Sequence, residues 1–138
     1  MKKLLGLTLF CSCLLSGAEF NQEMQNFLEE LKTQARTQNP NFVDFSAKEG
    51  ERIFVTQSVG REGKTLSCES CHQSDLRKEG LNVFTNKPLE PLSPNANPKR
   101  LSEVKEVKKW LKRNFKDVYA REGSPKEQGD VLLYILSK

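Results

Sequence analysis

Apolar residues recur every three or four positions in several stretches of this sequence, a spacing typical of amphipathic helices. A capping box at Ser46-Ala47-Lys48-Glu49 predicts one helix that continues through Val55. An earlier helix is expected to end before Asn39-Pro40, and its apolar stripe contains Phe20, Met24, Phe27, Leu28, Leu31 and Ala35. We expect Met24 to be a core residue within this stripe.

Two further helices are predicted in the last third of the chain. Ser102 is the expected N-cap of the first, whose stripe contains Val104, Val107, Trp110, Leu111 and Asn114. Ser124-Pro125-Lys126-Glu127 combines a capping box with proline at the first helical position and begins the last helix. Prolines at positions 88, 91, 94 and 98 predict that the segment before these two helices is extended or turning. Because no stretch alternates clearly enough for a strand, the pattern predicts a small all-α fold of about four helices.

The first residues have the pattern of a secretory signal peptide. Lys2 and Lys3 precede the apolar run Leu4–Leu15, and small residues follow up to Ala18. The run is shorter than the roughly 20 residues that a membrane span needs, and a lipid anchor at Cys13 would follow a poor attachment sequence. We therefore predict a signal peptide over residues 1–18, a mature domain over residues 19–138, and export to the periplasm.

The net charge of the chain limits which kinds of binding partner are expected. The chain of 138 residues carries a formal charge of +4, which falls to +2 when the signal peptide and its two lysines are removed. This charge is small and interspersed, so it does not indicate a nucleic-acid-binding protein. Basic residues gather between Lys99 and Lys116, either as a solvated helix face or as a docking patch for an acidic redox partner.

The strongest chemical signal is Cys68-Glu69-Ser70-Cys71-His72, the C-x-x-C-H motif of covalent haem c attachment. Two thiols on one helical turn can join the two vinyl groups of a single haem, and the histidine that follows can bind the iron. The alternative is a haem-free secreted protein with a redox-active Cys68–Cys71 disulfide. However, no βαβ pattern surrounds the motif, and too few further ligands remain for a zinc site.

The sixth iron ligand is unusual, because His72 is the only histidine and both methionines, Met1 and Met24, precede the motif. Asn114 shares the apolar helix face of Trp110, and an amide on such a face needs a partner. One possible partner is the haem iron. The alternative is that Asn114 lies at a helix terminus and bonds to backbone carbonyl groups there or caps the turn. The other candidate ligands are Lys108, Lys109, Lys112, Tyr119 and Tyr134.

The chain from Phe54 to Leu136 resembles the sphaeroides haem protein (SHP) family of class I-like cytochromes c. The resemblance rests on the segments Ser67–His72, Pro91–Arg100, Val107–Asn114 and Lys126–Leu132. It implies a class I cytochrome c-like fold with one haem c, Cys68 and Cys71 as thioether anchors, and His72 as the proximal ligand.

The resemblance also implies that Asn114 binds the oxidised iron and leaves on reduction, so that O2, NO or a similar ligand can bind. On physical grounds, a wall of Trp110, Leu111 and Phe115 is expected to keep bulk water scarce at this position. Such a protein carries electrons and binds small ligands rather than acting as a dedicated enzyme. A dihaem cytochrome c and a membrane cytochrome b are the electron donors implied. Family members can carry a disulfide after the asparagine, where this chain has Phe115 and Gly123. A carbonyl of the proline-rich segment is expected to orient His72, and Arg100 or Arg113 can pair a haem propionate.

Overall fold

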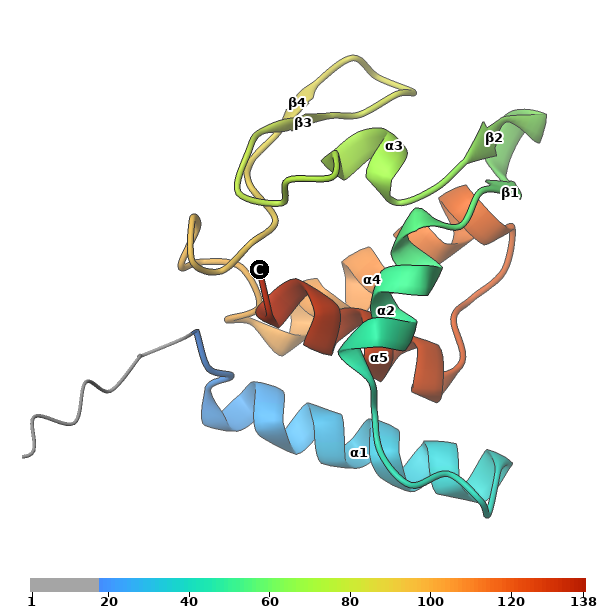
Figure 1. Ribbon diagram of the computed structural model, residues 1–138, viewed down its shortest axis with the longest axis vertical. Coiled ribbons are helices and arrows are strands. Elements are labelled where there is room, and N and C mark those ends of the chain that lie inside the picture. Colours follow the sequence, from blue (N-terminus) through green and yellow to red (C-terminus); the bar gives the residue numbers. More distant parts are fainter. Residues whose placement is uncertain (1–17) are drawn as a thin grey trace, which may run out of the picture.

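The computed structural model describes residues 18–138, so the predicted signal peptide lies outside the described residues except for Ala18. This part of the chain forms five α-helices, one short 3₁₀ helix and four strands of two residues each (Figure 1). The helices are α1 (Gln22–Gln38), α2 (Ala47–Val55), α3 (Glu69–His72), α4 (Val104–Tyr119) and α5 (Pro125–Leu136). The remaining elements are β1 (Ser58–Val59), η1 (Arg61–Gly63), β2 (Thr65–Leu66), β3 (Gly80–Leu81) and β4 (Pro88–Leu89).

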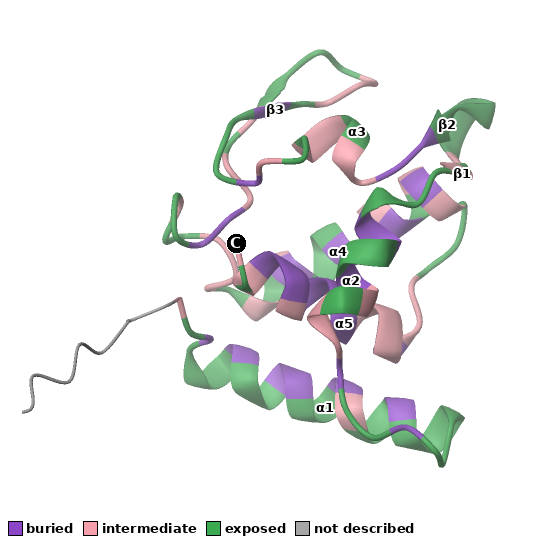
Figure 2. Cartoon of the chain, viewed as in Figure 1, coloured by how far each residue is buried: buried purple, intermediate pink, exposed green. Residues whose placement is uncertain are grey.

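Helix α1 lies along one side of the molecule and packs against α5 and α4. Asn21 caps it by accepting a hydrogen bond from the Met24 backbone N–H at 2.9 Å. Its buried side faces the rest of the protein and its charged side faces solvent (Figure 2). Met24 is fully buried in this interface, which confirms the prediction of a core methionine.

Helices α2 and α5 cross in close contact. A Cβ atom at Gly50 would lie 2.0 Å from the Asp130 carbonyl oxygen, so only glycine allows the two backbones to approach this far. The Asp130 carboxylate is buried and accepts a hydrogen bond from the Ser46 backbone N–H at 2.8 Å. Ser46 therefore makes only half of its predicted capping box: its hydroxyl accepts from the Glu49 N–H, while its own N–H bonds to Asp130.

The predicted N-cap of the third long helix is wrong. Helix α4 begins at Val104 with Glu103 in the N-cap position, and Ser102 lies one residue before this cap. There the Ser102 hydroxyl donates to the Lys99 carbonyl at 2.6 Å, and the Ser102 carbonyl accepts from the Asn21 side chain at 2.8 Å. The start of α5 is as predicted, with both hydrogen bonds of the capping box at Ser124 present.

The loops contain two small antiparallel hairpins that the sequence did not predict. β1 pairs with β2, and β3 pairs with β4. Each strand is two residues long, which is too short for an alternating pattern to be visible in the sequence. The β3–β4 hairpin lies beside α3, across the molecule from α1 (Figure 1).

Candidate functional site

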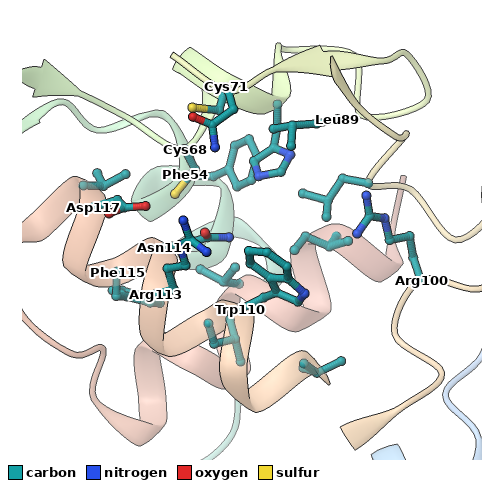
Figure 3. A pocket seen from close by; sticks show the side chains of 18 of the residues that line it. Phe54, Cys68, Cys71, Leu89, Arg100, Trp110, Arg113, Asn114, Phe115 and Asp117 are labelled. Carbon is teal, nitrogen blue, oxygen red and sulfur yellow. The ribbon is translucent and has the colours of Figure 1, made fainter. Parts of the chain in front are cut away.

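A cavity of about 510 Å³ is lined by residues of α3 and β4 on one side and of α4 and α5 on the other. Its volume falls within the range of about 300–1,000 Å³ that is usual for cofactor pockets. The floor is apolar and includes Phe54, Leu111 and Leu132. Figure 3 shows the side chains that reach into it from the different elements.

The Cys68–His72 motif forms one wall of this cavity, with Cys68, Cys71 and His72 all in the lining. Helix α3 is a single turn in which the N–H groups of Cys71 and His72 donate to the Cys68 carbonyl at 3.2 and 3.1 Å. Gln73, with φ of 62°, ends the turn. Both sulfur atoms are therefore presented to the same apolar space.

The two cysteines are free thiols in this structure. Burial raises the pKa of the Cys68 thiol to about 12, so this thiol stays neutral at physiological pH. Since the thiolate is the form that attacks disulfides, a buried neutral thiol is poorly suited to redox exchange. This environment disfavours the alternative of a redox-active Cys68–Cys71 disulfide.

Gly80 allows β3 to pass directly against the attachment turn. A Cβ atom at this position would lie 2.1 Å from the Cys71 carbonyl oxygen and 3.1 Å from the His72 Cα. The hairpin thus covers the back of α3 at backbone contact distance. No sequence pattern singled out this glycine, because the contact joins two elements that are separated by a loop.

His72 projects among aromatic side chains. Its ring centroid lies 6.2 Å from that of Phe54, which in turn lies 5.3 Å from Tyr134 of α5. Burial, and secondarily the positive charge of Arg100, lower the pKa of His72 to about 4. The imidazole is therefore neutral at physiological pH, which is the form that binds a metal.

Helix α4 forms the facing wall. Asn114 lies in the interior of this helix and lines the cavity, so it is not the helix-terminal cap that was one of its two predicted roles. Leu111 and Phe115 are buried beside it. Trp110 also lines the cavity but stays 42% exposed, because it stands at the rim rather than in the core (Figure 3).

The other candidate sixth ligands are engaged elsewhere and lie outside the cavity lining. Tyr119 donates its hydroxyl hydrogen to the Ile53 carbonyl, and Tyr134 packs on Phe54. The three candidate lysines on α4 form ion pairs at the surface, in the pairs Lys108–Glu30, Lys109–Glu106 and Lys112–Glu122. These pairs favour a solvated helix face as the explanation of the basic stretch.

The two positions at which family members can carry a disulfide lie in contact. A Cβ atom at Gly123 would be 2.8 Å from two atoms of the Phe115 ring. The ring therefore packs flat against the glycine backbone and holds the loop after α4 to the helix. Gln128 adds a hydrogen bond of 2.8 Å from its side chain to the Gly123 carbonyl.

Several residues that line the cavity were not predicted from the sequence, among them Phe84 and Asp117. Asp117 lies three positions after Asn114, so the shared helix face was a signal that could have identified it.

Arg100, which was predicted, lines the cavity, and its guanidinium donates to the carbonyls of Pro91 and Glu90 at 2.9 Å each. Arg113 lies at the rim, 5.4 Å from the Trp110 ring centroid. The expected carbonyl partner of His72 stays a prediction.

A small helical protein that presents a C-x-x-C-H turn to an apolar cavity is a class I-like c-type cytochrome. The family described as "Domain of unknown function (DUF1924)" matches residues 40–135. The chain is 34% identical to the cytochrome c-type protein SHP of Cereibacter sphaeroides over 92 residues, or 67% of this chain and 70% of that protein. The chain belongs to the SHP-like family of cytochromes c, which confirms the resemblance and the all-α class I fold.

Three further similarities support this assignment. Cytochrome c'' of Methylophilus methylotrophus is 28% identical over 104 residues, which are 75% of this chain and 72% of that protein. The structure of oxidised SHP, described as an oxygen-binding cytochrome c, matches with a TM-score of 0.73 at 25% identity, over 88% of this chain and all of that one. Oxidised cytochrome c'' matches equally well, with a TM-score of 0.73 at 25% identity, over 83% of this chain and 94% of that one.

Haem c is the cofactor of this family, and the residues at the cavity fit it. The volume is adequate, the lining is largely apolar, and the paired thiols and the neutral imidazole share one wall. The chain is thus a c-type cytochrome with one attachment motif for one covalently bound haem.

Proposed function

We propose that this chain is an exported, periplasmic monohaem cytochrome that carries electrons and has a detachable sixth ligand, Asn114. The observation that carries the proposal is the position of Asn114 in the interior of α4, at the cavity wall that faces the attachment turn. Asn114 lines the cavity, so its amide can reach a ligand held there.

The other roles follow from the cavity wall. Cys68 and Cys71 anchor the haem through thioether bonds, and His72 is the proximal ligand. Arg100, whose guanidinium is fixed by two loop carbonyls, has N–H groups left over for a haem propionate. Trp110 covers the rim and limits access of water. When bound, the haem supplies a one-electron couple and a sixth coordination position.

Asn114 is suited to a bond that reduction weakens. Its carbonyl oxygen is a hard, neutral donor, which prefers ferric iron to softer ferrous iron. Reduction should therefore release the amide and leave the position open to O2, NO or a similar small ligand. The description of the relative SHP as an oxygen-binding cytochrome c supports this class of ligand.

Electron donors are proposed from the family resemblance: a dihaem cytochrome c and a membrane cytochrome b. Among the described residues, no helix is long and apolar enough to cross a membrane. The basic side chains of α4 that carry ion pairs within the chain are only partly available to an acidic partner. Docking is therefore expected to depend on the cavity rim near Trp110 more than on net charge.

The test is a ferric absorption spectrum of the haem-loaded chain and its Asn114→Ala variant. Loss of the amide should move the spectrum toward high spin, whereas the control Lys112→Ala, on the outer face of the same helix, should leave it unchanged. A pyridine haemochrome assay first establishes covalent haem c. A ferric spectrum of Asn114→Ala identical to wild type would exclude Asn114 as the ligand. If CO and NO both leave the reduced Soret band unchanged, the site does not open.

A further inference from the structure

We propose that Asp117 is the acceptor that holds the Asn114 amide after this amide leaves the iron, and that Asp117 thereby sets how readily the sixth position opens. This role rests on the proposed function of Asn114 and adds a second residue to the same site. It makes Asp117 a positioning residue, which acts on the iron through Asn114.

The two side chains share one face of α4. Asp117 follows Asn114 by three positions, which places their Cβ atoms about 5–6 Å apart on a helix. Both residues line the cavity, and Figure 3 shows both on the α4 wall. This separation is within the combined reach of an asparagine amide and an aspartate carboxylate.

A released amide needs such a partner. A polar group left unpaired in an apolar cavity is destabilised, so the open state of the site is costly unless the Asn114 N–H groups find an acceptor. A carboxylate is the strongest acceptor that a side chain offers to a neutral amide, because charge-assisted hydrogen bonds are roughly twice as strong as neutral ones.

Asp117 is held in place from outside the cavity. Its side chain is only 20% exposed, and Arg61 of η1 lies 3.6 Å from its Oδ1 atom. Gly60 packs against the same turn of α4, where a Cβ atom would come within 2.1 Å of the Asp117 carbonyl oxygen. The second carboxylate oxygen, Oδ2, makes no ion pair or hydrogen bond with any other residue of the described chain. One oxygen thus lies beside a guanidinium that also pairs with Glu62, and the other oxygen is outside this pair.

The other carboxylates of the cavity wall are less suitable. Glu106 lies two turns before Asn114 and pairs with Lys109. Glu103 is the N-cap residue at the far end of the same helix. Glu90 lies in the proline-rich segment and accepts a hydrogen bond of 3.1 Å from a loop amide. Asp117 is therefore the acceptor best placed for the amide of Asn114.

Two substitutions separate this role from a simple charge effect. Asp117→Asn and Asp117→Ala both remove the negative charge, but only asparagine keeps an acceptor oxygen. Alanine is the best helix former, so α4 is expected to stay intact in this variant. We expect the reduction potential of the haem-loaded Ala variant to lie below that of the Asn variant. A tenfold weaker opening of the site corresponds to about 59 mV for one electron.

The reduction potentials of the Asp117→Asn and Asp117→Ala variants are then measured in an Asn114→Ala background. There the difference between the two potentials should disappear. Equal potentials of the two variants with Asn114 present would overturn the role of Asp117. A gap that persists without Asn114 would also overturn it, because Asp117 would then act on the iron directly. These outcomes are distinct from failure of the proposed function, which shows as an unchanged ferric spectrum in Asn114→Ala.

Discussion

Gly50→Ala tests whether the crossing of α2 and α5 fixes the architecture of the site. The substitution removes a helix-interior glycine, which by propensity alone stabilises α2 by about 1 kcal/mol. Against this gain, the new Cβ atom would meet the Asp130 carbonyl oxygen at 2.0 Å and the Tyr134 Cβ at 2.8 Å. Since the nearest atoms belong to the backbone, the helices must separate by about 1 Å.

Two costs follow from this separation. Overpacking at a helix contact costs about 1–3 kcal/mol. The hydrogen bond of 2.8 Å between the Ser46 N–H and the buried Asp130 carboxylate is strained or lost, which costs about another 1.5–3 kcal/mol. After subtraction of the propensity gain, the free energy of unfolding should fall by about 1.5–5 kcal/mol.

The assay is guanidinium unfolding of the haem-loaded protein, followed by far-UV circular dichroism and by the Soret band. Lys48→Ala, an exposed change on the same helix, is the control and should stay within about 0.5 kcal/mol of wild type. Phe54 lies one turn after Gly50 and contacts the His72 ring, so the Soret band should also shift in the variant. Stability equal to or above wild type would refute the reasoning.

Three further predictions use other parts of the structure. The Arg121 guanidinium, which donates to Glu127, lowers the pKa of this carboxyl group to about 2; a lowered folded-state pKa stabilises the protein above the unfolded pKa. Glu127→Gln should therefore be less stable at pH 7, and urea unfolding at several pH values should show the deficit shrinking as pH falls toward 2. Gly80→Ala should displace β3 from Cys71 and lower the free energy of unfolding of the haem-loaded protein in guanidinium, because the new Cβ atom would meet the Cys71 carbonyl oxygen at 2.1 Å, while the haem content measured by pyridine haemochrome per mole of protein should stay unchanged. Met24→Leu should leave the ferric spectrum unchanged and cost less than about 1.5 kcal/mol in thermal unfolding, because Met24 is a core residue outside the cavity lining; a spectral change would contradict this.

Local signals predicted the parts of the fold that depend on neighbouring residues. The capping box at Ser124 gave the start of α5, because both of its hydrogen bonds close within four residues. Ser102 failed as a cap because its hydroxyl and carbonyl bond to Lys99 and to Asn21, which is distant in the sequence. Tertiary partners of this kind compete with local motifs, and a single sequence does not reveal them.

The same distinction applies to the site. The attachment motif is contiguous, and Asn114 could be found because helical spacing links it to Trp110. The contact between Arg61 and Asp117 could not be predicted from helical spacing, because Arg61 lies in a separate hairpin. Its guanidinium is 3.6 Å from the Asp117 carboxylate. Its guanidinium also lies 4.6 Å from the Phe84 ring centroid, so it joins the loop after β3 to α4. No periodicity in the chain relates these three positions.

The close passage of β3 over α3 bears on the order of events in biogenesis. The Gly80 backbone lies against the Cys71 carbonyl on one side of the attachment turn, and both thiols line the cavity on the other side, so a haem held there is enclosed between the turn and α4. Haem attachment is expected to come before the hairpin docks, so the cofactor is enclosed by folding instead of entering a finished cavity.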